Sequence, residues 1–496
     1  MIAITGGRVL VMPSSTLERA DILIDGDTIV AVGERLRIPP DSILLDATGR
    51  IVLPGLINAH THAHNNLAKG TGDNWTLEDL RNHGPAIYSN RTPGEQYLSA
   101  AIGAVEMLKT GCTAAYDQFA AFPALTDEGV EAVIRAYSDV GMRAVLAPSA
   151  SDEVFYRAVP GLLDVLPEDL KRAVMAIQPA PAQQLLRLTK AAIQRWDGTA
   201  EGRIRIATAP VVPGECSDEF FSGCAKLSRD LGVGLHTHLA ETKVQAVSAY
   251  KRWGKTVVGH LAEIGVLGPS FVGGHGVWIT DADMRLLAES GASIAHNPAS
   301  NLKLGAGIAP IQELKEHGVT VGIGADGSMS SDNQNMFEAM RFAALVNKVR
   351  FPHEPDRWLG ANDVWAMATT AGARVLGMTE DIGAVAAGRK ADIILLRSNS
   401  IFLRPMNNVL NSLVYAESGA DVETVLVGGR VVVEQGRVTT VDEEALRDGA
   451  QVALQESLSR NTKLWALAER MTPFLRAACR ACASLPHPIN RYAAPV

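Results

Sequence analysis

The sequence predicts an α/β protein made of a (β/α)8 TIM barrel, a small β-sandwich domain and a C-terminal helical extension. Apolar segments of strand length alternate with helical patterns between residues 51 and 382, which is the repeat of such a barrel. Strand-like segments flank that region in residues 1–50 and 383–440, and neither block is large enough to stand alone, so together they predict one composite β-sandwich. Residues 441–496 follow a helical pattern and form the predicted extension.

The predicted barrel helices have clear start and stop signals. Thr92-Pro93-Gly94-Glu95 has capping-box spacing, with proline at the first helical position. Glycines such as Gly141 and Gly291 end helices, and an apolar strand follows each of them. A doubly wound open sheet is the competing fold, but no Gly-x-Gly-x-x-Gly follows the first strand. The eight predicted strands are Val52–His62, Thr113–Asp117, Arg143–Ala147, Ile204–Ala209, Val233–His238, Phe271–His275, Ser293–His296 and Thr320–Gly324.

The flanking segments carry the signals of short strands and tight turns. Asp25-Gly26-Asp27 and Gly428-Gly429 each separate two apolar runs, as the turn of a hairpin does. The predicted strands are Ile2–Ile4, Arg8–Met12, Ala20–Ile24, Thr28–Val32 and Ile43–Asp46 before the barrel, and Ala391–Leu396, Val422–Val427 and Arg430–Val433 after it.

The extension is predicted to contain two helices, Glu443–Ser459 and Asn461–Cys482. Cys479 and Cys482 have the spacing of a metal or redox pair, but no second cysteine pair accompanies them. Free cysteine in an Ala-rich helix packs like a small apolar residue. We therefore expect both thiols to be packed in a helix.

The composition excludes several classes of partner. Hydrophobic residues make up 47% of the chain, charged residues 20%, and the net charge is −8, which describes an ordinary globular protein. The charge is too mild and dispersed to indicate nucleic acid or an anionic membrane. No apolar run approaches the roughly 20 residues that cross a bilayer. Five scattered cysteines and the lack of a secretory signal predict a cytoplasmic protein.

Histidines and one aspartate stand at the carboxyl ends of four predicted strands. His60 and His62 are two residues apart on an extended segment, so their side chains point to the same side. His238 and His275 end two later strands, and Asp326 follows the last one. The carboxyl ends of barrel strands meet at one face. Imidazoles with a carboxylate are the donor set of a catalytic zinc-type site, so we predict one divalent metal ion there, zinc in first place with iron or manganese as alternatives.

These residues resemble the amidohydrolase superfamily, and within it the branch of triazine hydrolases and S-adenosylhomocysteine deaminases. The resemblance covers residues 1–440 and implies the same barrel and β-sandwich. It rests on His60-Thr61-His62, His238-Leu239-Ala240-Glu241, His275, the run from His296 to Gly305, Asp326 and Gly388-Arg389-Lys390-Ala391-Asp392.

The resemblance implies the metal ligands. His60, His62, His238 and Asp326 match the residues that hold one metal ion, and His275 matches a residue that either ligates it or contacts its water. The predicted strand Ile204–Ala209 contains no lysine that could hold a second metal through a carbamate, so a mononuclear site is expected.

The resemblance also implies the catalytic groups of a hydrolysis in which metal-held hydroxide attacks a C–N bond. Asp326 accepts the proton of the water, and Glu241 delivers it to a nitrogen of the substrate. His275 polarises the water or stabilises the developing oxyanion. Trp75 and Asn301 are further predicted substrate contacts.

The predicted reaction is deamination of a compact N-heterocycle of the purine-base, pterin, triazine or pyrimidine type, with a small-molecule substrate and a homo-oligomer expected. Val211 and Asn82 stand where nucleoside deaminases of the branch carry polar groups, which favours a base over a nucleoside. The alternative is hydrolysis of an aryl urea, carbamate or cyclic amide at the same site. A remote alternative is a non-enzymatic scaffold, but the complete ligand set opposes it.

Overall fold

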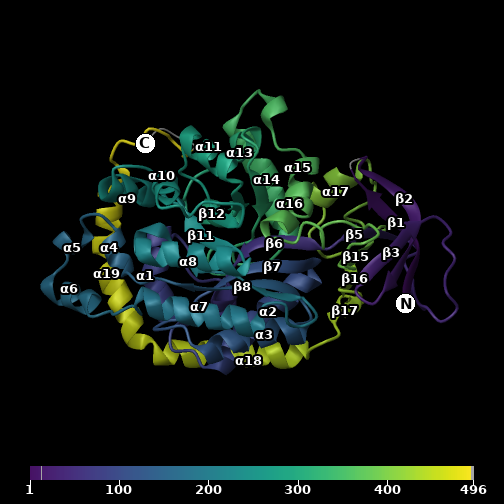
Figure 1. The fold of residues 1–496 in the computed structure, drawn as a ribbon, viewed down its shortest axis with the longest axis horizontal. Coiled ribbons are helices and arrows are strands. Elements are labelled where there is room, and N and C mark those ends of the chain that lie inside the picture. The colour runs from purple at the N-terminus through teal and green to yellow at the C-terminus, as the bar shows by residue number, and fades with distance from the viewer. Residues whose placement is uncertain (13, 493–496) are drawn as a thin grey trace.

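The structure, a computed structural model, describes residues 1–12 and 14–492 and confirms the predicted fold class. Figure 1 shows the barrel in the middle, the β-sandwich strands at one end and the C-terminal helices along the outside. No helix among the described residues is long and apolar enough to cross a membrane. The domain boundaries drawn from the sequence stay predictions.

Two sheets of parallel strands form the barrel wall. One has the order β10-β8-β7-β6 with β9 beside β8, and the other the order β11-β12-β13-β14. Parallel bridges between Thr61 and Asp326 and between Thr208 and Leu235 join the two sheets on both sides. The barrel strands are β6 (Leu56–Thr61), β7 (Cys112–Phe119), β8 (Arg143–Ala150), β9 (Ile204–Ile206), β10 (Ala209–Pro210), β11 (Leu235–Leu239), β12 (Phe271–His275), β13 (Ser293–His296) and β14 (Thr320–Ile323).

The prediction of one strand over Val52–His62 is wrong, because the chain changes sheets within it. β5 (Arg50–Pro54) pairs with strands of the β-sandwich, whereas β6 begins the barrel. Gly55 separates them. A Cβ at this glycine would lie 2.0 Å from Thr113 Oγ1, so only glycine allows the backbone to approach β7 this closely.

The β-sandwich strands come from both ends of the barrel chain. They form one nine-stranded sheet with the order β18-β17-β16-β15-β5-β1-β2-β3, and β4 pairs with β1. The predicted strands Ile2–Ile4 and Arg8–Met12 are parts of one strand with an irregularity between Ile4 and Gly7. The strands are β1 (Ile2–Val11), β2 (Thr16–Asp25), β3 (Thr28–Gly33), β4 (Ile43–Asp46), β15 (Ile393–Arg397), β16 (Val422–Val427), β17 (Arg430–Glu434) and β18 (Arg437–Val438).

A buried ion pair joins the base of the barrel to this sheet. Arg143 opens β8, and its Nε and Nη2 donate to the two Asp392 oxygens at 2.9 and 3.0 Å. The Arg143→Ala variant should lose about 3–5 kcal/mol of unfolding free energy, because Asp392 stays buried without its cation. Chemical denaturation measures the loss. The exposed pair of Arg285 with Asp281 supplies the control, since Arg285→Ala should cost less than about 1 kcal/mol. Equal losses of unfolding free energy in the two variants would show that the Arg143–Asp392 pair does not stabilise the protein more than an exposed pair.

Helices cover the outside of the barrel. Those that follow the first strands are η1 (Ala63–Ala68), α1 (Leu77–Tyr88), α2 (Pro93–Lys109), α3 (Asp127–Val140), α4 (Phe155–Ala158), α5 (Leu162–Val165), α6 (Glu168–Met175), α7 (Ala182–Trp196), η2 (Pro213–Glu215) and α8 (Asp218–Leu231). The later ones are α9 (Lys243–Trp253), α10 (Val257–Glu263), α11 (Asp281–Ser290), α12 (Pro298–Lys303), α13 (Ile311–Glu316), α14 (Met336–Arg350), η3 (Pro355–Arg357), α15 (Ala361–Met367), α16 (Thr370–Val375) and α17 (Val409–Tyr415).

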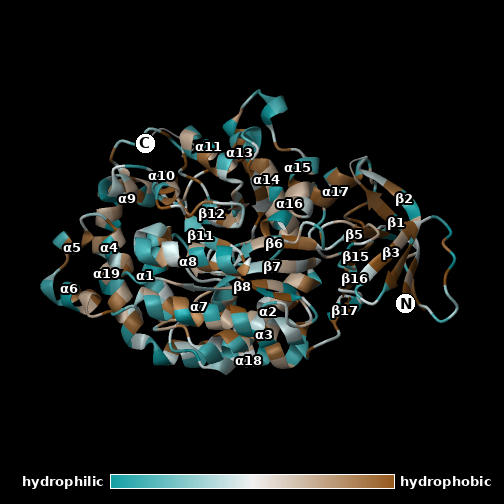
Figure 2. Ribbon diagram, viewed as in Figure 1, coloured by the Kyte–Doolittle hydropathy of each residue, from teal (hydrophilic) through white to brown (hydrophobic). Residues whose placement is uncertain are grey.

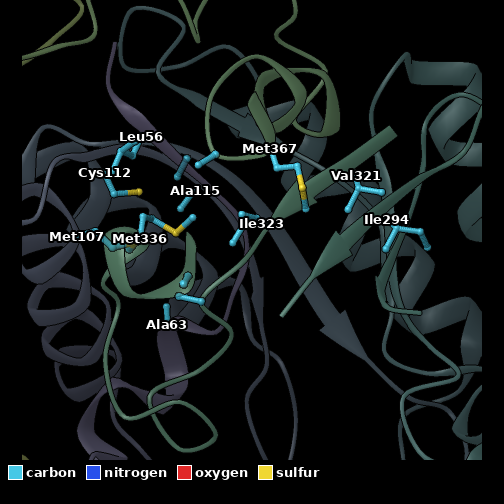
Figure 3. Close-up of a cluster of buried hydrophobic side chains, with 14 of the residues drawn as sticks. Leu56, Ala63, Met107, Cys112, Ala115, Ile294, Val321, Ile323, Met336 and Met367 are labelled. Atoms are coloured by element: carbon cyan, nitrogen blue, oxygen red, sulfur yellow. The ribbon is translucent and has the colours of Figure 1, made fainter. Parts of the chain in front are cut away.

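The main apolar core lies between the barrel strands and these helices. Figure 2 shows hydrophobic residues gathered on strands such as β7 and β8, and hydrophilic residues on outer helices such as α6. In Figure 3, Leu56 of β6 and Cys112 of β7 pack near Met336 of α14, while Val321 and Ile323 extend the same cluster along β14. This continuous packing holds the strand ends, and therefore the site, in place.

The extension consists of α18 (Glu443–Arg460) and α19 (Thr462–Ala483), close to the predicted bounds. Figure 1 shows α18 passing along α2 and α19 continuing along the end of the barrel away from the β-sandwich. α19 packs on α1, α5 and α9. Cys479 and Cys482 are buried in this contact as free thiols, as expected.

Candidate active site

Four strand ends bring the predicted metal-ligating side chains together at one face of the barrel. His62 Nε2 lies 3.1 Å from His238 Nε2 and 3.2 Å from Asp326 Oδ1. His60 Nε2 lies 3.5 Å from the same carboxylate oxygen, and His275 Nε2 lies 3.9 Å from Asp326 Oδ2. Two overlapping groups, His60 with His238 and His275, and His60 with His62 and Asp326, have ligand atoms within 4.8 Å of one another.

The hydrogen bonds around these imidazoles fit a cation between them. His62 Nδ1 lies 2.8 Å from the Gln118 carbonyl oxygen and His238 Nδ1 lies 2.7 Å from that of Val211. A carbonyl oxygen only accepts, so both Nδ1 atoms carry the proton and both Nε2 atoms present lone pairs to each other. His60 Nε2 is also buried without a hydrogen-bond partner. A divalent ion satisfies such a set of lone pairs.

The backbone is strained where the strands end. His275 and Asp326 have φ values of +70° and +62°, a left-handed conformation that costs a non-glycine residue roughly 1–2 kcal/mol. The Asp326 N–H donates to the His60 carbonyl oxygen at 2.9 Å, which draws β14 against β6. Gly324 permits this approach, because a Cβ there would lie 2.8 Å from His60 Cβ and 2.9 Å from His60 N. The fold therefore holds these side chains in a geometry that relaxed strands would not adopt.

The pKa values of the two carboxyl groups of the site, Asp326 and Glu241, are shifted in opposite directions. Burial raises the pKa of Asp326, but the neighbouring imidazoles of His60, His62 and His275 outweigh it, and the net pKa is well below the usual value. Burial and the nearby Asp326 charge raise the pKa of Glu241 well above its usual value. Glu241 Oε1 is buried without a hydrogen-bond partner, 3.6 Å from His275 Nδ1. One carboxylate can accept a proton while the other carboxyl holds one.

A pocket opens above these residues, and one wall of it is polar. Glu78 and Arg81 of α1 line this wall, and Arg81 forms an ion pair with Glu215. Glu78 Oε1 accepts a hydrogen bond from Thr242 Oγ1 at 2.8 Å. The polar lining comprises His62, His64, Asn65, Glu78, Arg81, Tyr88, Gln118, Ser149, Glu215, His238, Glu241, Gln245, Ser248, His275, Asp326 and Ser330, with apolar side chains such as Phe155, Val159, Val244 and Met329 between them.

Comparison with known proteins agrees with the geometry. The model of the amidohydrolase family matches residues 51–432, more than half of the chain. The chain belongs to the amidohydrolase family. It is thus a hydrolase that acts on carbon–nitrogen bonds, as the sequence predicted.

Several named amidohydrolases are similar over most of their length. A 5-methylthioadenosine/S-adenosylhomocysteine deaminase of Caldanaerobacter subterraneus is 32% identical over 430 residues, which cover 86% of this chain and 92% of the relative. A 5'-deoxyadenosine deaminase of Methanosarcina mazei is 32% identical over 462 residues, 92% of this chain and 99% of the relative. The structure of atrazine chlorohydrolase from Arthrobacter aurescens TC1 complexed with zinc has a TM-score of 0.82 and 30% identity, covering 92% and 100% of the two chains.

Neither residue predicted to contact substrate in this amidohydrolase lines the pocket. Trp75 stacks on His83 with ring centroids 4.4 Å apart, so it packs the loop before α1. Asn301 lies beneath His275, and its Oδ1 accepts from His275 Nδ1 at 2.9 Å. Neither contact could be predicted from the sequence. Strand patterns and motifs do not show how α1 and α12 pack, and both contacts depend on that packing.

The stretch around Asn82 contributes a polar group to the pocket, contrary to the expectation from the sequence. Asn82 faces away from the pocket and donates to the Ala468 carbonyl oxygen of α19 at 2.8 Å. Its neighbour Arg81 enters the pocket instead, with Glu78 one turn earlier on the same helix face. The Thr76 to Asp79 capping box is a sequence signal that could have placed these residues, because it fixes where α1 begins.

Replacement of Asn301 by alanine should weaken the site through His275. The ring loses the acceptor that fixes its orientation, and loss of such a support typically lowers metal affinity or activity by about 10–100-fold. Metal titration and steady-state kinetics measure both quantities. Asn411→Ala on exposed α17 is the control. Unchanged values for both quantities in Asn301→Ala would show that Asn301 does not position His275.

Proposed function

We propose that this amidohydrolase is a metal-dependent aminohydrolase that releases ammonia from a purine-type N-heterocycle. The observation that carries the proposal is the pair of buried carboxyl groups, Asp326 among the imidazoles with a lowered pKa and Glu241 beside His275 with a raised pKa. Proton acceptance from water and proton delivery to nitrogen are the two tasks of a hydrolytic deamination. The names of the deaminase relatives support the same reaction.

His60, His62, His238 and Asp326 would hold one divalent cation, with His275 at its edge. Such an ion lowers the pKa of a water molecule from about 15.7 towards 7 and thus makes hydroxide available at neutral pH. Zinc is the proposed ion. The imidazole-rich donor set suits it, and the atrazine chlorohydrolase structure contains zinc.

Asp326 and Glu241 then carry out the proton transfers of the reaction. The oxygen of water adds to the ring carbon that bears the amine, and Asp326 takes the proton released from that water. Glu241 gives its proton to the ring nitrogen, and the proton on Asp326 goes to the amine, which leaves as ammonia. The remaining proton of the added hydroxyl group returns to Glu241 as the carbonyl forms. A carbonyl replaces the amine on the heterocycle. Val211 and the apolar side chains of the pocket keep bulk water away from these transfers.

The polar wall suits a substrate that carries hydroxyl groups beside the heterocycle. Glu78, Arg81, Tyr88 and Glu215 present charged and hydroxyl groups to the pocket. A sugar could form hydrogen bonds with them, so the preference for a free base over a nucleoside drawn from the sequence is withdrawn. A purine nucleoside or its 5'-deoxy form is the substrate class that we propose.

A substrate panel tests the proposal. Zinc-loaded protein is assayed with adenosine, 5'-deoxyadenosine, adenine, a diamino-triazine, atrazine and an aryl urea, and ammonia, chloride and arylamine are measured separately. Ammonia from an aminopurine supports the proposal. Arylamine release from the urea would instead support the amide-type alternative, and chloride release from atrazine a chlorohydrolase. No product from protein with stoichiometric metal would contradict the proposed activity.

Assembly and location stay predictions from the sequence. We propose a homo-oligomer in the cytoplasm with neither nucleic acid nor membrane as partner. Light scattering of the purified protein gives its mass in solution, and a monomer of 52.8 kDa would contradict the oligomer.

A further inference from the structure

Gln118, near the carboxyl end of β7, carries a buried amide that no protein group satisfies. Its side chain lines the pocket, and the residue is 0% exposed. Among the described residues, it is the one buried amide whose nitrogen and oxygen both lack a hydrogen-bond partner. An unpaired buried amide lowers stability, so the Gln118 side chain is a candidate for hydrogen bonds with a group from outside the protein.

The strand geometry directs this amide into the pocket. Side chains alternate along β7, and Phe119 faces the main core between strands and helices. Tyr116, two residues before Gln118 on the same side of the strand, faces the barrel interior. The Gln118 carbonyl oxygen accepts from His62 Nδ1 at 2.8 Å, which fixes this position next to the metal-ligating cluster.

His64 places a second, fixed hydrogen-bond donor beside Gln118. The Ala120 N–H donates to His64 Nδ1 at 3.1 Å, so Nδ1 carries a lone pair and the proton of the neutral ring is on Nε2. The side chain lines the pocket and the residue is 7% exposed, but Nε2 makes no hydrogen bond to any residue that the structure describes. Arg91 Nη1 donates to the His64 carbonyl oxygen at 2.6 Å and holds the residue in place.

We infer that Gln118 and His64 form a recognition edge for the heterocycle. This inference rests on the proposed function and names the part of the substrate that these residues bind. The amide offers one donor and one acceptor, and His64 Nε2 offers a further donor. The amide nitrogen and His64 Nε2 fit a purine edge that presents ring-nitrogen acceptors, N3 or N7, away from the amine that leaves. Gln118 lies near the end of β7 and His64 follows β6, whereas Glu241 follows β11 and His275 ends β12, across the barrel. The ring therefore spans the pocket, with its reacting carbon at the metal site and its remote edge at Gln118.

Replacement of Gln118 by methionine separates recognition from folding. Methionine has nearly the same length without the unpaired amide, so the melting temperature of metal-loaded, substrate-free protein should stay equal or rise. The kcat/KM for adenosine should fall by about 10–100-fold through KM, because a missing hydrogen-bond partner is costly in a buried site. Metal content should not change. Gln183→Met on α7, where Gln183 is exposed, is the matched control.

Substrate analogues identify the contacted atoms. In 3-deazaadenosine and 7-deazaadenosine one ring nitrogen is replaced by CH. For the analogue that lacks the contacted nitrogen, Gln118→Met should lower kcat/KM by less than threefold. His64→Asn keeps an acceptor for the Ala120 N–H but loses the Nε2 donor, and should raise KM; His64→Gln, which restores a donor near that point, should recover part of the loss.

Two results would overturn the inference. A melting temperature several degrees lower in Gln118→Met would show that protein groups satisfy the amide. An equal loss of kcat/KM in Gln118→Met for adenosine and both deaza analogues would show that the Gln118 amide contacts no ring nitrogen. If wild-type protein releases no ammonia, the proposed function has failed. Ligand-induced stabilisation by adenine, guanine, pterin and melamine then decides the inference, since Gln118→Met must reduce it for at least one of them.

Discussion

Replacing Glu241 with glutamine is expected to lower aminopurine turnover by about 10²–10⁴-fold without loss of metal. Glutamine has the same shape as glutamate but holds no proton that it can deliver. Glu241 belongs to neither group of side chains that could hold the ion, so metal content should stay at the wild-type value. Its buried Oε1 lacks a hydrogen-bond partner, which leaves it free to meet the substrate. Steady-state kinetics and metal analysis of the same preparation measure the two quantities.

The exposed Glu289 of α11 supplies the control for this variant. Glu289→Gln makes the same chemical change outside the pocket and should leave turnover as it is. If Glu241→Gln retained full turnover, Glu241 would not be the proton donor. If it lost its metal as well, the role of the carboxyl group would be to support the ligands.

Removal of the metal should abolish turnover and lower stability together. With their Nδ1 protons bound to carbonyl oxygens, His62 and His238 present two lone pairs 3.1 Å apart, and without a cation these repel. A ligand at about 1,000 times its Kd stabilises the folded state by about 4 kcal/mol, so zinc in such excess should raise the melting temperature of chelated protein. Calorimetry and kinetics before and after chelation measure both effects.

A matched pair of histidine variants assigns this effect to the site. His238→Asn should lose the metal and most of the turnover. His317→Asn, at a histidine that pairs with Asp281 away from the pocket, should change neither. Full turnover in chelated protein, or no recovery with Zn²⁺, Fe²⁺ or Mn²⁺, would contradict a metal-dependent reaction.

The clustering of the candidate metal ligands could be predicted from the sequence because each of them stands at or just after the end of a predicted strand. His60, His62, His238 and His275 are polar residues at the ends of strands whose other residues are buried, and parallel strands must end at the same face of a barrel. The fold alone then brings them together. The positions of these side chains can therefore be predicted without knowing how the helices pack.

The pocket wall could not be predicted in the same way. Glu78 and Arg81 enter the pocket because of how α1 lies against the barrel, and α1 is held by α19 through contacts such as Asn82 with Ala468, almost 400 positions later. Arg476 of α19 also donates to Asp79, next to Glu78. No local pattern encodes a contact across that separation. No role could be assigned to Gln118 or His64 from the sequence for a different reason. Both are notable because side-chain atoms lack hydrogen-bond partners among the described residues, which only the structure shows.

The pairing of β5 with β15 gives this enzyme a particular order of assembly on the ribosome. β5 ends at residue 54 and its antiparallel neighbour begins at residue 393, with the barrel strands between them. At about 5–20 residues per second, β5 waits on the order of 20–70 seconds for that partner. During this time its β15-facing edge is open to pairing with other chains. The barrel strands, which end at residue 323, therefore leave the ribosome before β15 can complete the β-sandwich.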